Sequence, residues 1–143
     1  MTYWVIDANL AVNTVLSMSD SLNLFWDRAD QEQITPCAPR LWMSETTSAI
    51  RFLLSQKHIT SGEAEQALRT VFGLQLEIID EDEELGLRAL ELADKLGQSK
   101  AYDAIYLALA EKLDAEFWTA DERLANRCRK DLNLSWAHSI ADL

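Results

Sequence analysis

Two acidic residues follow closely on the most strand-like stretches of this sequence. Asp7 comes directly after the apolar run Tyr3–Ile6, and Asp121 comes just after the β-rich run at residues 115–119. The carboxyl ends of parallel strands meet at one edge of a sheet, where open α/β sheets bind their ligands. Two carboxylates at one such edge are costly unless a cation lies between them. The pattern therefore predicts a metal site that includes Asp7, Asp121 and further acids.

Two further acids lie on helices that the sequence predicts to be buried. Residues 104–110 are all apolar, which is typical of a helix buried on every side, so Asp103 is expected near the interior. Glu45 lies in a helix predicted over residues 39–56. At about 100° per residue it falls roughly 60° from Trp42, on the apolar side of that helix. Both carboxylates are therefore candidates for the same site.

Each of the four acids also has an ordinary structural explanation. Asp7 could close a turn, and Asp103 and Asp121 could cap helices. Glu45 could extend to the rim of the molecule. These explanations treat the acids one at a time, whereas four acids at strand ends and on buried helix faces together favour a shared function.

The elements that would position these acids alternate between strand and helix along the chain. Strands are predicted at residues 3–6, 34–38, 74–79, 115–119 and 134–137. Helices are predicted between them, one with Pro39 in its first turn and one capped by Thr60 or Ser61. Such alternation implies right-handed crossovers and a parallel sheet covered on both faces. We therefore expect an α/β fold in which residues 1–143 form one domain.

The composition restricts the partners of the protein. A net charge of −11 argues against a broad basic face for nucleic acid, but not against an enzyme that meets a phosphate through metal ions. It also makes a basic partner protein plausible. Cys37 and Cys128 belong to no metal-binding motif and are interpreted as structural thiols in a reducing cytosol. We expect a cytoplasmic protein that does not span a membrane, because the sequence has no long apolar stretch and no basic leader.

Taken together, these motifs resemble the PIN domain, and among its branches the VapC-type toxins of prokaryotic toxin–antitoxin pairs. The resemblance rests on VIDAN at residues 5–9, on a helix that bears Glu45, on YDAIYLALA at residues 102–110, and on TADERL at residues 119–124. It covers essentially the whole chain in order and spacing. The third and fourth blocks together are quite specific, whereas the first alone is weak.

The resemblance implies a three-layer α/β/α sandwich around a parallel sheet of four to five strands, with Mg²⁺- or Mn²⁺-dependent ribonuclease activity. By position, the acidic residues of the family correspond to Asp7, Glu45, Asp103 and Asp121. Asn9 and Thr119 correspond to polar residues that support these carboxylates. Many relatives have Asn three residues after the helix Glu, and this chain departs from them with Ser48, which still donates a hydrogen bond.

The chemistry of Mg²⁺ suits this set of residues, because the ion takes about six oxygen ligands and retains several waters. Asp7 and Asp103 are assigned as primary ligands, with Asp121 as a ligand directly or through water. Glu45 would hold a second ion or orient the water that attacks the RNA phosphodiester. Candidate phosphate contacts are the basic neighbours of these acids in sequence, although a surface charge is the simpler explanation for each: Arg40, Lys100 and Arg123.

The expected function is that of a ribonuclease toxin with a cognate antitoxin, and three alternatives to it are considered. A catalytically silent PIN-like binding or scaffold module would be expected to lack one or more of the acids, and a housekeeping PIN nuclease would lack the antitoxin. A phosphatase of the haloacid dehalogenase kind needs an Asp two residues after the first, where this chain has Asn9. The apolar side chains Trp26, Trp42 and Phe52 exceed what one copy is expected to bury, so a homodimer is predicted.

Overall fold

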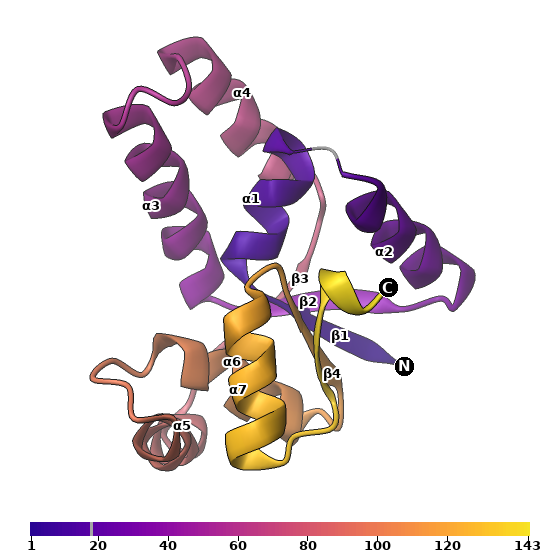
Figure 1. Cartoon of the computed structure of the whole chain (residues 1–143), viewed down its shortest axis with the longest axis vertical. Helices are drawn as coiled ribbons and strands as arrows, with labels where there is room; N and C mark the ends of the chain where they lie inside the picture. Colours follow the sequence, from indigo (N-terminus) through magenta and orange to yellow (C-terminus); the bar gives the residue numbers. More distant parts are fainter. Residues whose placement is uncertain (18) are drawn as a thin grey trace.

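A computed structural model describes residues 1–17 and 19–143 and contains a five-stranded sheet in the order β3-β2-β1-β4-β5 (Figure 1). The strands are β1 (Tyr3–Ile6), β2 (Thr35–Pro39), β3 (Glu77–Ile79), β4 (Glu116–Thr119) and β5 (Ala137–Ser139). Each neighbouring pair of strands is parallel. The predicted parallel sheet is confirmed, with five strands.

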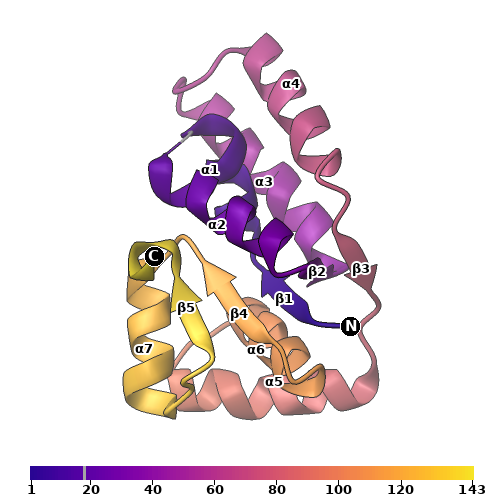
Figure 2. The ribbon, with the colours of Figure 1, turned by 90° about the vertical axis from the view of Figure 1, so that its right-hand side faces the viewer.

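Helices cover both faces of this sheet. They are α1 (Ala8–Leu16), α2 (Asp20–Gln31), α3 (Leu41–Ser55), α4 (Ser61–Phe72), α5 (Glu83–Leu96), α6 (Tyr102–Lys112) and α7 (Glu122–Leu132), followed by the short 3₁₀ helix η1 (Ile140–Asp142). The helices α1 and α2 lie on one face, and α5, α6 and α7 lie on the other (Figures 1 and 2). The pair α3 and α4 extends beside α1. The predicted three-layer α/β/α arrangement is therefore confirmed.

The strand order reverses between β1 and β4. The chain passes from β1 to β2 and β3 on one side, then crosses to β4 and β5 on the other. Right-handed crossovers in opposite directions place the following helices, α1 and α7, on opposite faces of the sheet. A crevice opens between two such helices at the carboxyl ends of the central strands, which is the usual ligand site of open parallel sheets.

The central strands are apolar because both of their faces are covered. Val5, Ile6 and Phe117 are fully buried, and Trp4 and Trp118 are nearly so. Parallel strands that are buried on both faces have near-continuous apolar sequences, as these two do. The position of the strand ends, and hence of the acids that follow them, is therefore set by the core of the molecule.

Several element boundaries differ from the prediction, among them the start of the third strand, which is predicted at residue 74 and lies at Glu77. Pro39 is the last residue of β2, where the strand ladder ends, and α3 begins two residues later at Leu41. The last strand begins at Ala137 and not near residue 134, because Asn133 ends α7 in the left-handed conformation and a turn over residues 134–137 follows. Thr60 caps α4 in a capping box with Glu63, as its sequence indicates.

Part of the predicted exposed apolar face is buried. Trp42 packs in the core at 3% exposure, and Trp26 is partly buried and donates a hydrogen bond to Thr14. The reason is that α2 and α3 turn these rings toward the sheet and its neighbouring helices, which the sequence does not specify. Phe52 remains 61% exposed.

None of the helices in residues 1–17 and 19–143 is long and apolar enough to cross a bilayer.

Candidate active site

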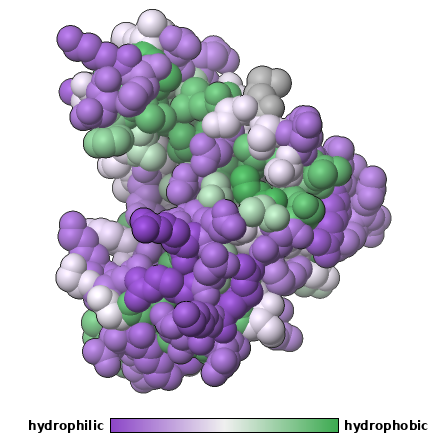
Figure 3. Space-filling view, viewed as in Figure 1, coloured by the Kyte–Doolittle hydropathy of each residue, from purple (hydrophilic) through white to green (hydrophobic). Residues whose placement is uncertain are grey.

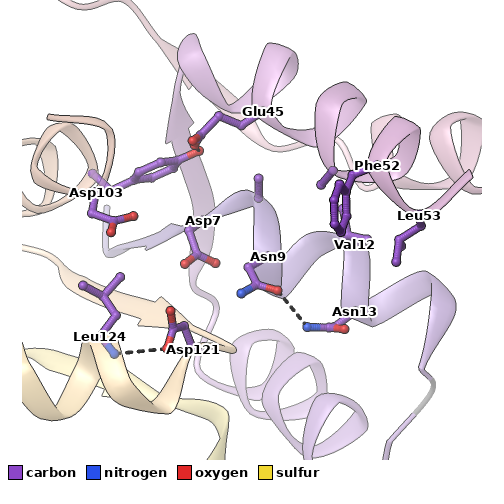
Figure 4. A pocket seen from close by; sticks show the side chains of 13 residues that line it. Asp7, Asn9, Val12, Asn13, Glu45, Phe52, Leu53, Asp103, Asp121 and Leu124 are labelled. Carbon is purple, nitrogen blue, oxygen red and sulfur yellow. Dashed lines mark hydrogen bonds between the residues drawn. The ribbon is translucent and has the colours of Figure 1, made fainter. Parts of the chain in front are cut away.

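A cavity of about 360 Å³ lies at the carboxyl ends of β1 and β4 (Figure 4). Four acidic side chains line it, and they come from four different segments of the chain: Asp7, Glu45, Asp103 and Asp121. Asp7 and Asp121 follow the two central strands, whereas Glu45 comes from α3 and Asp103 from α6. The structure therefore brings together all four acids that the sequence singled out.

Asp7 is the most buried of the four acids, at 6% exposure. It is the N-cap of α1, where its Oδ1 accepts a hydrogen bond from the Leu10 amide at 2.9 Å, and the Thr119 hydroxyl donates to its Oδ2. Burial raises the pKa of Asp7 from 3.8 to about 7, against these two hydrogen bonds, which lower it. The charges of Asp103 and Glu45 raise the pKa further. A cation at this position would relieve both effects.

Asp121 is the N-cap of α7 and is joined to Asp7 through a shared neighbour. Its Oδ1 accepts a hydrogen bond from the Leu124 amide at 3.1 Å. The Thr119 hydroxyl oxygen accepts a hydrogen bond from the Asp121 amide at 2.9 Å while donating to Asp7. The cap explanation therefore applies to both aspartates, but in each of them it accounts for only one carboxylate oxygen.

Asp103 lies within the first turn of α6 and is not its cap, because Ala101 occupies the N-cap position. Its Oδ2 accepts a hydrogen bond from the Gln98 side-chain amide at 2.9 Å. Sequence reasoning missed Gln98. It lies in the loop that follows α5, where no periodic pattern indicates the direction of a side chain.

Glu45 is held by a tyrosine from another helix, α6. The Tyr106 hydroxyl donates to Glu45 Oε1 at 2.6 Å, and Tyr106 itself is 1% exposed. Burial raises the pKa of Glu45, the Tyr106 hydrogen bond lowers it, and the charge of Asp103 raises it. Sequence reasoning treated Tyr106 as part of an apolar helix. Its position three residues after Asp103, on the same helix face, was the available signal.

The other predicted residues lie around the acids in different ways. Asn9 lines the cavity, but its Oδ1 accepts a hydrogen bond from Asn13 and not from a group beside the acids. Lys100 lines an adjoining hollow together with Glu45 and Asp103. The other two basic candidates lie elsewhere. Arg40 pairs with Asp80 at 2.6 Å on the surface, and Arg123 is exposed and does not line the 360 Å³ cavity.

The donor set suits a hard divalent cation, since all four acidic groups offer carboxylate oxygens. None of the described residues that line the cavity is a lysine or arginine, so the negative charge is not balanced within the chain. Within residues 1–17 and 19–143, no three acidic, imidazole or thiol groups converge closely enough to ligate one ion. Without side-chain movement, an ion would therefore contact at most two of the acids directly, with waters completing its shell.

Comparison with known proteins connects this geometry to a family. Residues 4–130 match the family model described as PIN domain. No curated protein matches the chain. Among solved structures, the chain is similar to one in VapBC2 from Rickettsia felis bound to a DNA fragment from their promoter, at 16% identity and a TM-score of 0.69, covering 96% of this chain and 98% of that chain.

Two further solved structures share the fold. PAE2754 from Pyrobaculum aerophilum is 16% identical with a TM-score of 0.71, covering 99% of this chain and 85% of that chain. A chain of a toxin–antitoxin complex from Klebsiella pneumoniae is 17% identical with a TM-score of 0.63, covering 95% and 96%. At these identities the likeness concerns the fold.

Proposed function

Because the chain belongs to the PIN-domain family, we propose that it is a ribonuclease that depends on Mg²⁺ or Mn²⁺ and hydrolyses RNA phosphodiester bonds. The observation that carries the proposal is the burial of Asp7 beside three further carboxylates. The described residues that line their cavity supply no positive charge. A bound divalent cation balances this charge and at the same time draws the phosphate of a substrate into the cavity.

In this proposal, Asp7 and Asp103 hold the ion, and Asp121 contributes through a water, or directly once its side chain moves toward the ion. Glu45 orients the attacking water or takes part in binding a second ion. When bound, the ion lowers the pKa of a water for in-line attack and stabilises negative charge on the phosphoryl oxygens. Thr119 supports the arrangement, because it donates to Asp7 and accepts from the backbone of Asp121, which keeps both carboxylates oriented.

Among the basic residues, Lys100 is the favoured phosphate contact. It lines a hollow together with Glu45 and Asp103, so its ammonium group is the basic group placed to contact a phosphate bound near these acids. Arg40 is engaged with Asp80, and Arg123 does not line the cavity. Asn9 also lines the cavity, but its hydrogen bond is with Asn13 and not with an acid, so the proposed metal chemistry does not use it.

Cleavage of RNA by the purified protein tests this function. Total cellular RNA should be cut in the presence of Mg²⁺ or Mn²⁺, and EDTA should stop the reaction. Asp103→Asn should reduce cleavage at least ~100-fold, because a neutral amide is a poor ligand for a hard cation. Asp94→Asn, at an exposed aspartate on α5, is the matched control and should cleave like the wild type. Cleavage that continues in EDTA would falsify the metal-dependent mechanism.

We further propose that the protein is the toxin of a type II toxin–antitoxin pair, acts in the cytoplasm and forms a homodimer. Two of the similar structures, from Rickettsia felis and Klebsiella pneumoniae, carry VapBC or toxin–antitoxin in their names, which supports an antitoxin partner. The acidic cavity suits an arginine of such a partner, which would pair with the carboxylates in place of metal. A catalytically silent scaffold is less well supported, because all four acids are present.

A further inference from the structure

The cavity has a second half that the proposed metal chemistry does not use. Beyond the acids, α1 contributes Asn9, Val12 and Asn13, and α3 contributes Phe52 with Leu53 (Figure 4). The α1 residues are spaced three and four apart, so they lie on one helix face. The cavity is thus acidic at one end and amide-lined and apolar at the other.

Phe52 presents an aromatic ring to solvent beside the acids. It lies seven residues after Glu45, which places it two helical turns, or about 10 Å, further along the same face of α3. Its side chain is 61% exposed, whereas Trp42 on the same helix is buried. In Figure 3, hydrophobic side chains gather between α1, α3 and α4, while the surface over α5, α6 and α7 is mostly hydrophilic. An exposed ring in this position is a platform on which a planar group can stack.

The amide of Asn13 faces the same space and is held in one orientation. Asn13 Nδ2 donates to Asn9 Oδ1 at 3.0 Å, and the Ser17 hydroxyl donates to Asn13 Oδ1 at 3.2 Å. These contacts use one N–H and one lone pair of the amide and leave a second N–H and a second lone pair. Asn13 therefore offers a donor and an acceptor side by side, which matches a base edge that presents both, as adenine does.

The charge of the cavity argues for base contacts rather than phosphate contacts in this half. None of the described lining residues is basic, and the chain carries a net charge of −11. A strand cannot be held here by cationic side chains, which supply much of the affinity of most nucleic-acid-binding proteins. Stacking and neutral hydrogen bonds are the remaining sources of affinity, and both require an unpaired base.

We propose that this half of the cavity is a base-binding subsite in which Phe52 stacks on the base next to the scissile phosphate and Asn13 hydrogen-bonds to its edge. The proposal rests on the ribonuclease activity proposed above. It assigns the choice of base next to the cleaved bond to residues outside the acidic set.

A randomised single-stranded RNA library, cleaved with Mn²⁺ and sequenced at its cut ends, tests the subsite. The wild type should show a base preference at one position beside the cut, and Asn13→Asp should change it, because a carboxylate accepts but does not donate. On a fluorogenic oligonucleotide taken from the preferred sites, Phe52→Leu should raise KM on the order of 10-fold with little change in kcat. Phe52→Trp, which keeps the stacking surface, should behave like the wild type.

Matched controls separate this effect from a general loss of surface. Leu90→Ala removes a side chain that is 64% exposed on α5, and Asn23→Ala removes an exposed amide on α2 outside the cavity. Both should leave KM and the base preference unchanged. An unchanged KM in Phe52→Leu, with Asp103→Asn still inactive, overturns the subsite and leaves the nuclease intact. A Phe52→Leu variant that changes only its oligomeric state assigns the ring to a protein interface instead. A wild type that cuts no RNA in the library overturns both proposals.

Discussion

Asp7 combines burial with a position at the end of a central strand. Its pKa is raised from 3.8 to about 7, chiefly by burial, so the folded protein holds a proton that the unfolded chain releases near pH 4. The stability that this residue contributes is therefore present below about pH 4 and is lost as the pH rises through about 7. At neutral pH, a cation bound at the site would recover that loss by favouring the ionised carboxylate.

Asp103→Asn tests the electrostatic cost of the site by stability rather than rate. The change removes repulsion with Asp7 and Glu45, which is worth on the order of 1–2 kcal/mol at a partly buried site. It also removes a favourable charge from the first turn of α6, worth roughly 0.3–1 kcal/mol. The relief of repulsion is larger than the lost interaction with the N-terminus of α6, so the variant should melt a few degrees above wild type in EDTA at neutral pH.

Magnesium supplies the second arm of this experiment. Millimolar Mg²⁺ should raise the melting temperature of the wild type and leave Asp103→Asn little changed, since an ion that binds only the folded state stabilises it by mass action. If Asp103 served only the helix, Asn would leave the metal response as it was. A wild type whose melting temperature ignores Mg²⁺ up to about 10 mM rules out the site as described.

Two helices from different parts of the chain are joined directly beside the site. The Tyr106 hydroxyl on α6 donates to Glu45 on α3, across 61 residues of sequence. Burial raises the pKa of Tyr106, so the phenol keeps its proton and remains a donor. The contact positions the Glu45 carboxylate and also fixes α3, which carries Phe52, relative to the layer of helices on the other face of the sheet.

Tyr106→Phe should remove the hydrogen bond between α6 and α3 without opening a cavity, because only the hydroxyl group is lost. Loss of a hydrogen bond to a charged group should lower the free energy of unfolding by about 1–2 kcal/mol, which is a few degrees in melting temperature. Tyr3→Phe is the matched control, because Tyr3 makes only a long, exposed contact of 3.4 Å with Glu77. Chemical denaturation of both variants in EDTA measures the difference. Equal stabilities of the two variants would show that the Tyr106–Glu45 contact contributes nothing.

On the scale of the whole molecule, the surface combines an acidic cavity with exposed apolar side chains. The chain has a net charge of −11 and an open acidic cavity, while exposed apolar side chains remain at Phe52 on α3 and at Leu87 and Leu90 on α5. In Figure 3 the surface is hollowed between α3 and the layer formed by α5 and α6. A basic, partly apolar polypeptide is the kind of partner that complements such a surface.

Co-expression with a basic neighbouring gene product tests this partnership. Expression of the protein alone should arrest growth, the partner should relieve the arrest, and the two should co-purify, because a basic segment pairs with the acidic cavity. Asp103→Asn should express without arrest. Light scattering of the free protein should give the mass of two copies. If wild-type expression does not arrest growth and no neighbouring product co-purifies, the toxin proposal fails in favour of a housekeeping nuclease.

Local patterns in the sequence determined the strands, most helix ends and the positions of the four acids. Periodicity, caps such as Thr60 and acids placed after apolar strands depend on neighbours a few residues away, and these relations persist in the folded chain. The resemblance to the PIN domain pointed to the same residues, and the match over residues 4–130 confirms that the chain belongs to this family.

Only the tertiary structure decided which side chains surround the acids. Gln98 and Tyr106 act through contacts across loops and layers, and Trp42 is buried while Phe52 on the same helix is exposed. The reason is that the environment of a side chain depends on which distant element packs against it. Sequence spacing orients a residue on its own helix, but the order of the strands and the angles between layers determine what it meets there.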